Sequence, residues 1–261
     1  RTYPDVVTVG YNELLIGRAI ENDDDNSATL GYDRCAMAVL DYYQAIPLFD
    51  RVLPHISLSD VTVAVIDSGL WVESGQFDDI LPRTQFPGVS YPAEIPYDWH
   101  LYKHGTNVAA LIAADNGDGL TNGVALRVLG ERLHLIVGEA HIWGNLYSLA
   151  RCLARTQEAV QLGADIVNIS LGLDDPRGRP SWLPAAQAQF DRLFNASPDV
   201  LFIAAAANDR TVLNGNDVPA GMPNANLLTV GGFQSCNPDQ KYFMSATGAA
   251  IEIAGPATDI P

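Results

Sequence analysis

Positively charged residues are scarce in this sequence. Its 261 residues include 15 Lys and Arg against 31 Asp and Glu, which gives a formal net charge of −16 at pH 7. Nucleic acids and anionic membrane surfaces are bound through concentrated Lys and Arg, and no basic run occurs anywhere in the chain. The composition therefore excludes nucleic acid as a partner and argues against an anionic membrane surface.

Cysteine and long apolar runs are also scarce. The three cysteines, Cys35, Cys152 and Cys236, are far apart, so they form no zinc-binding or redox motif and at most one disulfide. No apolar run has the length of about 18 residues that a membrane-spanning helix needs. Residues 1–5 do not begin a signal peptide, and the compartment stays open because such a peptide can be removed. No phosphate-binding glycine motif occurs, so no nucleotide cofactor is expected.

Apolar residues, by contrast, make up 48% of the chain, which is enough to fill the core of one large α/β domain. Continuous apolar runs that end in turn residues predict buried strands of a parallel sheet. Five such runs occur, at Val61–Ile66, Leu133–Val137, Asp165–Ser170, Val200–Ala205 and Leu227–Val230.

Helical patterns lie between these runs. Residues 145–162 predict an amphipathic helix that is capped by Gly163, and residues 106–114 and 184–194 predict two more helices. The apolar face expected for the first helix consists of Leu146, Leu149, Cys152, Leu153 and Val160. Strands that alternate with helices predict an α/β fold with a doubly wound, mostly parallel sheet flanked by helices. In such folds the functional site lies beyond the carboxyl ends of the strands.

The N-terminal part of the chain is less regular. It contains a polar acidic loop at residues 22–26, and an amphipathic helix is expected over residues 33–48. We therefore predict an N-terminal lead-in or extension over residues 1–48 and a single domain over residues 49–261.

Three polar residues stand at or near the expected ends of strands. Asp67 ends the first apolar run, His104 opens a helical segment, and Asn208 follows the alanines at 204–207. Each of them alone has an ordinary structural explanation, as a turn or capping residue or as a satisfied histidine. A bare carboxylate at the end of a buried strand needs a partner, however, because its burial costs several kcal/mol.

Four motifs occur in a fixed order along the chain: Val-Ile-Asp67-Ser-Gly, His104-Gly-Thr, Asn168-Ile-Ser-Leu-Gly172 and Ala-Ala-Ala-Asn208-Asp. Together they resemble the subtilisin-like serine peptidases, the subtilase family, over roughly residues 48–259. The order Asp, His, then Ser is the one found in subtilisin. The resemblance implies a subtilisin-like fold and the hydrolysis of peptide bonds through an acyl-enzyme.

The resemblance also implies roles for individual residues. Asp67 is expected to orient and polarise His104, which takes a proton from a serine hydroxyl. Asn208 is expected to donate a hydrogen bond in the oxyanion hole. Ser170, Leu171 and Gly172 are expected to bind the backbone of a polypeptide substrate as a strand edge. Ala205, Ala206 and Ala207 are expected to form a wall of the pocket for the residue before the scissile bond.

Two features depart from the family pattern. Ala207 replaces the glycine that usually precedes the oxyanion asparagine, and a methyl group there can narrow the pocket. In addition, the Gly-Thr-Ser-x-Ala motif that carries the nucleophile does not occur in the 261 residues. Ser68, Ser170 and Ser245 are poor substitutes by position. We therefore expect the nucleophile on a second chain or on a C-terminal segment beyond residue 261, and we expect this chain alone to be inactive.

No cofactor is required for this chemistry, but a structural calcium ion is a further expectation. Asp115 and Asp118 lie in an Asp-Asn-Gly-Asp-Gly loop, in a region where many relatives bind calcium, and calcium prefers such oxygen ligands. An ordinary solvated turn explains the same residues.

Two other functions remain open. A non-catalytic binding or scaffold module of the same fold would explain Ala207 and the missing serine motif. An enzyme acting on a small molecule would require the motif order to be a coincidence. For a peptidase, the family resemblance implies secretion, and the acidic charge favours basic peptides only through long-range steering.

Overall fold

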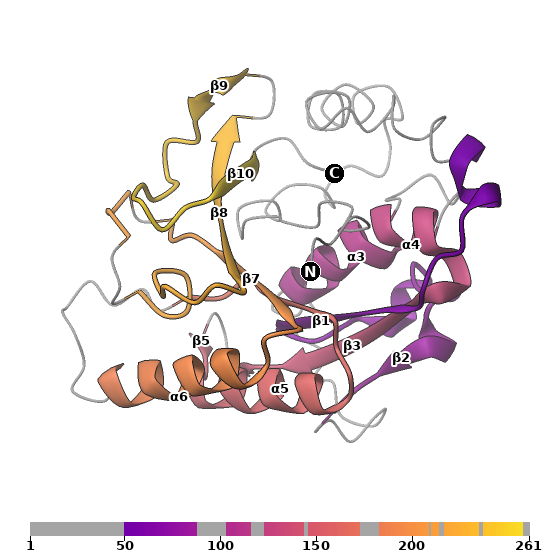
Figure 1. The fold of residues 1–261 in the computed structure, drawn as a ribbon, viewed down its shortest axis with the longest axis horizontal. Coiled ribbons are helices and arrows are strands. Elements are labelled where there is room, and N and C mark those ends of the chain that lie inside the picture. The colour runs from indigo at the N-terminus through magenta and orange to yellow at the C-terminus, as the bar shows by residue number, and fades with distance from the viewer. Residues whose placement is uncertain are drawn as a thin grey trace.

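The chain folds around one large β-sheet, which a computed structural model shows with helices on both faces (Figure 1). The structure describes residues 50–87, 103–115, 123–143, 146–172, 183–208, 210–213, 217–234 and 237–257. The sheet contains these strands: β1 (Val61–Asp67), β2 (Thr84–Gln85), β3 (Leu133–Glu139), β6 (Ile166–Ile169), β7 (Leu201–Ala205), β8 (Leu227–Gln234), β9 (Asn237–Lys241) and β10 (Ile253–Pro256).

The strand order makes this a doubly wound sheet. The order is β10-β8-β7-β6-β1-β3-β2, every pair along it is parallel, and β9 pairs antiparallel with β8 at the side. From β1 the chain adds β2 and β3 on one side of this strand and then β6, β7, β8 and β10 on the other, which confirms the predicted fold class. All the carboxyl ends of these parallel strands lie along one edge of the sheet, and that edge carries the candidate site.

The helices form two layers. They are α3 (Lys103–Ala113), α4 (Val124–Leu129), α5 (Leu149–Gln161) and α6 (Leu183–Ala196), with short 3-10 turns η2 (Leu53–His55), η3 (Val72–Ser74), η4 (Leu81–Arg83) and η5 (Gly130–Arg132). In Figure 1, α3 and α4 lie on one side of the sheet and α5 and α6 on the other. A separate two-stranded hairpin, β4 (His141–Trp143) with β5 (Leu146–Tyr147), follows β3.

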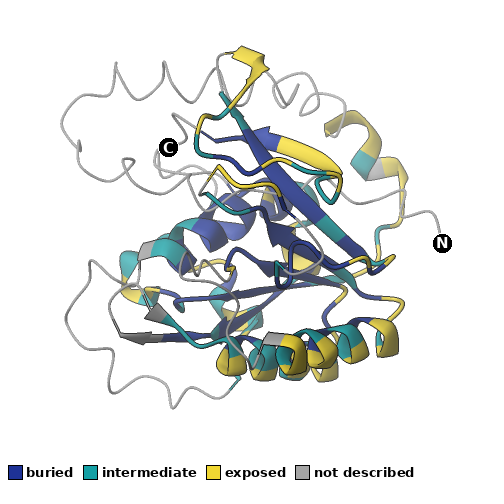
Figure 2. Cartoon of the chain, turned by 90° about the vertical axis from the view of Figure 1, so that its left-hand side faces the viewer, coloured by how far each residue is buried: buried dark blue, intermediate teal, exposed yellow. Residues whose placement is uncertain are grey.

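Alternating side chains of the central strands fill two separate cores. Val63 and Val65 of β1 point into the core beneath α3, whereas Ala64 and Ile66 point into the core beneath α5 and α6. Figure 2 shows that the central strands are buried and that the outer sides of α5 and α6 are exposed, whereas β9 is exposed along its whole length. Burial on both faces explains why these strands read as unbroken apolar runs in the sequence.

The three helices predicted between the apolar runs occur, but two of them begin several residues away from the expected start. The helix expected from Asn145 begins at Leu149, because Leu146 and Tyr147 form β5 and the Ser148 hydroxyl caps the helix by accepting a hydrogen bond from Arg151 N (3.2 Å). Its buried residues are Cys152, Thr156 and Ala159, so including Leu146 in the helix face was wrong. Gly163 has a φ of 89°, as expected at the end of this helix.

The helix expected from Thr106 begins three residues earlier, at Lys103, so His104 lies in its first turn. The strands β2, β4, β5, β9 and β10 and helix α4 were not predicted. The acidic loop at residues 22–26, the helix over residues 33–48, Cys35, Cys236 and Asp118 lie outside the described residues. The boundary at residue 48 stays a prediction.

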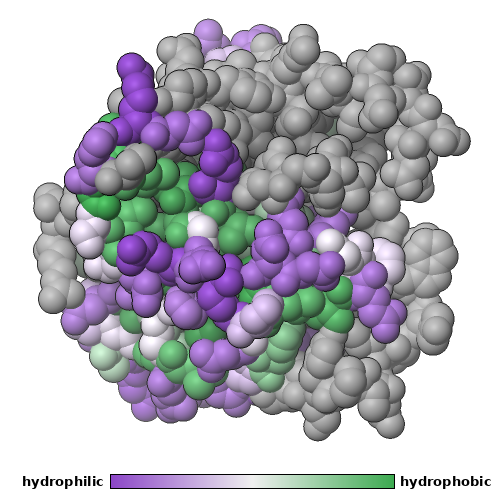
Figure 3. All heavy atoms as spheres, turned by 90° about the vertical axis from the view of Figure 1, so that its right-hand side faces the viewer, coloured by the Kyte–Doolittle hydropathy of each residue, from purple (hydrophilic) through white to green (hydrophobic). Residues whose placement is uncertain are grey.

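The surface carries both hydrophobic and hydrophilic side chains. Figure 3 shows the side of the molecule near η2, α4 and β2, where hydrophobic patches reach the surface between hydrophilic side chains. Val52 and Ile56 are among the exposed apolar residues. Among the described residues, no helix is both long enough and apolar enough to cross a membrane.

Candidate active site

A buried carboxylate and a histidine meet at the end of β1. The Nδ1 atom of His104 lies 2.7 Å from Oδ1 and 2.8 Å from Oδ2 of Asp67. The Asp67 side chain is fully buried and the His104 side chain is 18% exposed. Because a carboxylate can only accept hydrogen bonds, Nδ1 carries the proton and Nε2 is the nitrogen that can act as a base.

The turn after β1 holds the two residues in register. Ser68 N donates to Asp67 Oδ1 (2.7 Å), and the Ser68 hydroxyl accepts a hydrogen bond from Gly105 N (2.8 Å). A Cβ atom at position 105 would lie 2.4 Å from the Gly69 carbonyl oxygen and 3.1 Å from Asp67 Cβ. Gly105 is therefore required for the close approach of α3 to this turn, which brings His104 within reach of Asp67.

A second connection runs through the hairpin after β3. Ala140 N donates to the Asp67 carbonyl (2.7 Å), and Ser148 N donates to the Ala140 carbonyl (2.9 Å). On the other side, Trp71 N donates to Thr106 Oγ1 (2.9 Å). The Asp67–His104 pair thus lies in a frame of backbone hydrogen bonds that joins β1, α3 and the start of α5.

Cys152 is buried in α5 on the side of the sheet opposite α3. The pKa of the Cys152 thiol is raised to about 12, chiefly because the thiol is buried; the Thr156 hydroxyl lowers the pKa and the Asp67 charge raises it by smaller amounts. The thiol therefore stays protonated near neutral pH and adds no second negative charge beside Asp67. Cys152 is a free cysteine, and its buried environment makes the thiol unreactive.

The residues expected to bind substrate backbone continue β6 past its last paired residue, Ile169. Ser170 and Leu171 are buried, and the Ser170 hydroxyl accepts a hydrogen bond from Asn168 Nδ2 (3.0 Å). Gly172 is exposed, and a Cβ atom built on it would meet nothing within 4 Å. The segment is thus anchored at its start and open at its end.

The alanines after β7 are tied to their neighbours through the backbone. Ala206 N donates to the Val230 carbonyl (2.8 Å), and the Ala207 carbonyl accepts from Ala246 N (2.7 Å). Ala205 and Ala206 are buried, and Ala207 is half-buried. Among the described residues, Arg210 is the only non-glycine residue with a positive φ. The methyl group of Ala207 therefore does not force a strained backbone before Asn208.

Two amide side chains near this edge have unsatisfied buried atoms. Asn208 Oδ1 and Asn107 Nδ2 are both buried and have no hydrogen-bond partner among the described residues. Asn107 lies three residues after His104 in α3, which places it on the same side of the helix. A buried polar atom without a partner is uncommon and marks a place where a further group can bind. Sequence reasoning singled out Asn208 but missed Asn107.

Three serines considered as substitutes for the nucleophile have structural contacts instead. The Ser245 hydroxyl is buried, accepts from Gly232 N (2.9 Å) and donates to the Ala246 carbonyl (3.2 Å). The hydroxyls of Ser68 and Ser170 are the hydrogen-bond acceptors described above, and both side chains are fully buried. These contacts favour a structural role for each of the three.

Asp115 lies directly after α3, beside the carboxylates of Asp78 and Asp79. Its carboxylate accepts a hydrogen bond from Asp79 N (3.1 Å). Burial raises the pKa of Asp115, and the two neighbouring charges add to that effect. Among the described residues, no group of three or more His, Cys, Asp or Glu side chains is arranged to hold a metal ion. Calcium binding by Asp115 and Asp118 stays a prediction.

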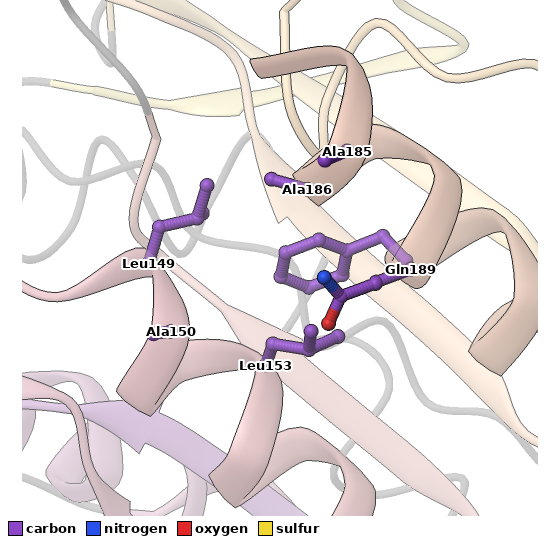
Figure 4. Close-up of a pocket in the computed structure, with 7 residues that line it drawn as sticks. Leu149, Ala150, Leu153, Ala185, Ala186 and Gln189 are labelled. Carbon is purple, nitrogen blue, oxygen red and sulfur yellow. The ribbon is translucent and has the colours of Figure 1, made fainter. Parts of the chain in front are cut away.

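A groove lies between α5 and α6. It has a volume of about 380 Å³ and is mostly apolar (Figure 4). It is lined by Leu149, Ala150, Leu153, Ala185, Ala186, Gln189 and Phe190. Phe190 and Leu171 belong to the same core cluster, and Leu149 and Leu153 pack against it. The groove thus opens onto the same hydrophobic core to which Leu171 belongs.

Comparisons with known proteins identify the family and the fold. The model of the subtilase family matches residues 59–259. The minor extracellular protease Epr of Bacillus subtilis (strain 168) is 26% identical over 202 residues, which are 77% of this chain and 27% of that protein. The chain thus spans about a quarter of the length of this curated relative.

Solved structures share the fold at low sequence identity. A lanthipeptide protease has a TM-score of 0.59 at 18% identity, with 87% of this chain and 62% of that chain covered. The epidermin leader peptide processing protease EpiP from Staphylococcus aureus has a TM-score of 0.57 at 18% identity, covering 92% and 61%. The prenylagaramide maturation protease PagA has a TM-score of 0.54 at 23% identity, covering 80% and 68%. At such identities the likeness shows the fold alone.

Proposed function

The chain belongs to the subtilase family, and we propose that it provides most of the catalytic machinery of a secreted serine endopeptidase. One observation carries the proposal, namely the 2.7 Å contact between His104 Nδ1 and the buried carboxylate of Asp67. This contact fixes the tautomer in which Nε2 can accept a proton. The name of the extracellular relative Epr supports the location outside the cell.

In the proposed reaction, His104 Nε2 takes the proton from a serine hydroxyl as the serine oxygen attacks the scissile carbonyl. The Asp67 carboxylate stabilises the imidazolium that forms, and the Asn208 amide donates a hydrogen bond to the oxyanion. The imidazolium then protonates the leaving amine, which completes the acyl-enzyme. Water repeats the same proton transfers and releases the acid, so His104 ends each cycle neutral.

We place the nucleophile outside the 261 residues, on a C-terminal segment or a second chain. The absence of a Gly-Thr-Ser-x-Ala motif from the sequence supports this placement. The structural hydrogen bonds of Ser68, Ser170 and Ser245 support it as well.

Covalent labelling by a fluorophosphonate probe tests the proposal. We expect labelling of a longer protein that includes the sequence after residue 261, and no labelling of the 261-residue chain. The probe reacts only with an activated serine, so a longer protein with His104→Ala is the control and should lose the label. Labelling of the isolated 261-residue chain would contradict the placement of the serine. A folded longer protein without any labelling would instead favour the scaffold function.

For the substrate, we propose a polypeptide that lies along Ser170–Gly172 and extends toward the groove between α5 and α6. The apolar lining of the groove suits an apolar side chain on the amino-terminal side of the scissile bond. Several solved neighbours are proteases that process leader peptides, and peptide substrates of that kind are consistent with the groove.

Filling the groove should change substrate preference. We expect Ala150→Trp to lower kcat/KM by roughly tenfold for peptides with a large apolar residue upstream of the scissile bond. The tryptophan would fill the groove, so that the apolar side chain of the substrate could no longer be buried there. Peptides with alanine there should change less than about twofold. Ala154→Trp, on the same helix but outside the groove lining, is the matched control. An equal loss for both peptide types would contradict binding in the groove.

A further inference from the structure

The ring of Tyr147 lies between two imidazoles. Its centroid is 6.5 Å from that of His104, with an angle of 65° between the ring planes, and 5.6 Å from that of His141, with an angle of 75°. Both are edge-to-face arrangements, which aromatic rings prefer at such separations. Neither Tyr147 nor His141 belongs to the motifs singled out in the sequence.

The hairpin that carries Tyr147 and His141 is attached to the Asp67 backbone. His141 and Tyr147 face each other as cross-strand partners in β4 and β5. The residue before β4, Ala140, donates to the Asp67 carbonyl, and the residue after β5, Ser148, donates to Ala140 and caps α5. The distance between Tyr147 and the Asp67–His104 pair is therefore set by the same backbone that places Asp67.

His141 is buried beneath this hairpin. Only 3% of His141 is exposed, and its carbonyl accepts a hydrogen bond from Arg151 Nη1 (2.5 Å). Tyr147 itself is half-buried. The edge-to-face contact with the buried imidazole of His141 limits the rotation of the Tyr147 ring.

These contacts bear on the orientation of His104. Its imidazole is held at Nδ1 by Asp67, but a hydrogen bond at one atom still allows the ring to tilt about that bond. A neighbouring aromatic ring in an edge-to-face arrangement restricts this tilt, and with it the opening of the Nδ1–H···carboxylate hydrogen bond to water. We propose that Tyr147 is a positioning residue for His104 and that His141 acts through Tyr147 by fixing its ring. Only the expected effect on kcat rests on the proposed function; the expected effect on the His104 Hδ1 proton does not.

Nuclear magnetic resonance of the imidazole protons tests the proposal on the 261-residue chain. We expect Tyr147→Leu to raise the water-exchange rate of the His104 Hδ1 proton roughly three- to tenfold, because the ring contact is lost. Tyr147→Phe keeps the ring and should restore the wild-type rate. His141→Leu should give an intermediate increase, and it provides a second test if Tyr147→Leu does not fold. The other imidazoles, His134 included, give internal references in the same spectra.

Kinetics of a longer, active protein provide the second readout. Tyr147→Leu should lower kcat by roughly three- to tenfold and change KM by less than about twofold, because the contact orients the base rather than the substrate. Tyr242→Leu is the matched control, since Tyr242 is also half-buried but stacks on Phe243 at 4.9 Å. It should leave both the Hδ1 exchange rate and kcat unchanged.

Two results would overturn the proposal. One is a Hδ1 exchange rate in Tyr147→Leu within twofold of the wild type, and the other is an equal effect of Tyr147→Phe and Tyr147→Leu. If the wild-type longer protein hydrolyses no peptide, the proposed function fails, and the exchange measurement still decides whether Tyr147 positions His104.

Discussion

Asp67→Asn should lower kcat by roughly 10⁴-fold in a protein that contains its serine nucleophile. The Asp67 carboxylate accepts hydrogen bonds from both Ser68 N and His104 Nδ1. An asparagine keeps one accepting oxygen and places an NH₂ group in the other position. That NH₂ group favours the tautomer in which Nδ1 accepts and Nε2 carries the proton, so His104 can no longer act as a base. Peptide hydrolysis under saturating substrate measures the loss.

Asp165→Asn is the matched control for this variant. The Asp165 carboxylate also accepts a backbone hydrogen bond, from Thr62 N at the start of β1 (2.9 Å), but it lies at the opposite end of that strand from Asp67. We expect kcat to change by less than about twofold, because the substitution touches no reacting group. If Asp67→Asn retained more than a tenth of the wild-type kcat while staying folded, the assignment of Asp67 would be wrong.

Asn208→Ala should lower kcat by roughly 100- to 1000-fold and leave KM nearly unchanged. The magnitude is the one known for the loss of this amide donor in subtilisin. The physical reason is that the hydrogen bond to the oxyanion forms in the transition state and not with the ground-state carbonyl, so binding of the substrate is little affected. Steady-state kinetics with a single peptide separate the two parameters.

Ala207→Gly is the informative comparison at this site. It introduces the glycine that the family usually has before the oxyanion asparagine. Because Ala207 has no positive φ and its carbonyl accepts from Ala246 N, we expect less than about a threefold change in kcat. A loss in Asn208→Ala that appeared in KM rather than in kcat would show that Asn208 binds the substrate and does not stabilise the transition state.

The elements of the fold differ in how well local sequence predicts them. The strands β1, β6 and β7 were predictable because they are buried on both faces and read as apolar runs. The start of α5 was not, because Leu146 fits both a helical face and the strand β5, and only the pairing with β4 decides between them. The exposed strand β9 has no apolar alternation and gave no signal.

The residues of the candidate site also differ in whether the sequence alone could identify them. Asp67, His104 and Asn208 were identified because motifs are local, and each motif combines a strand or helix end with one polar residue. The contact between Tyr147 and His104 was missed because it joins elements that are distant in the chain, and the burial of the Asn107 amide became evident only in the folded chain. Gly105 stands inside the recognised His-Gly-Thr motif, but its close contact with Gly69 became evident only in the folded chain.

By itself, then, the sequence determined the class of fold, the family and the identity of the Asp67–His104 pair, because burial periodicity and short motifs are properties of neighbouring residues. The tertiary structure alone decided that the pair is in contact at 2.7 Å and that an aromatic ring lies beside it. These distances follow from the order of strands in the sheet, in which β1 lies between β3 and β6. That order results from packing among residues about 70 to 100 positions apart, which no local pattern records.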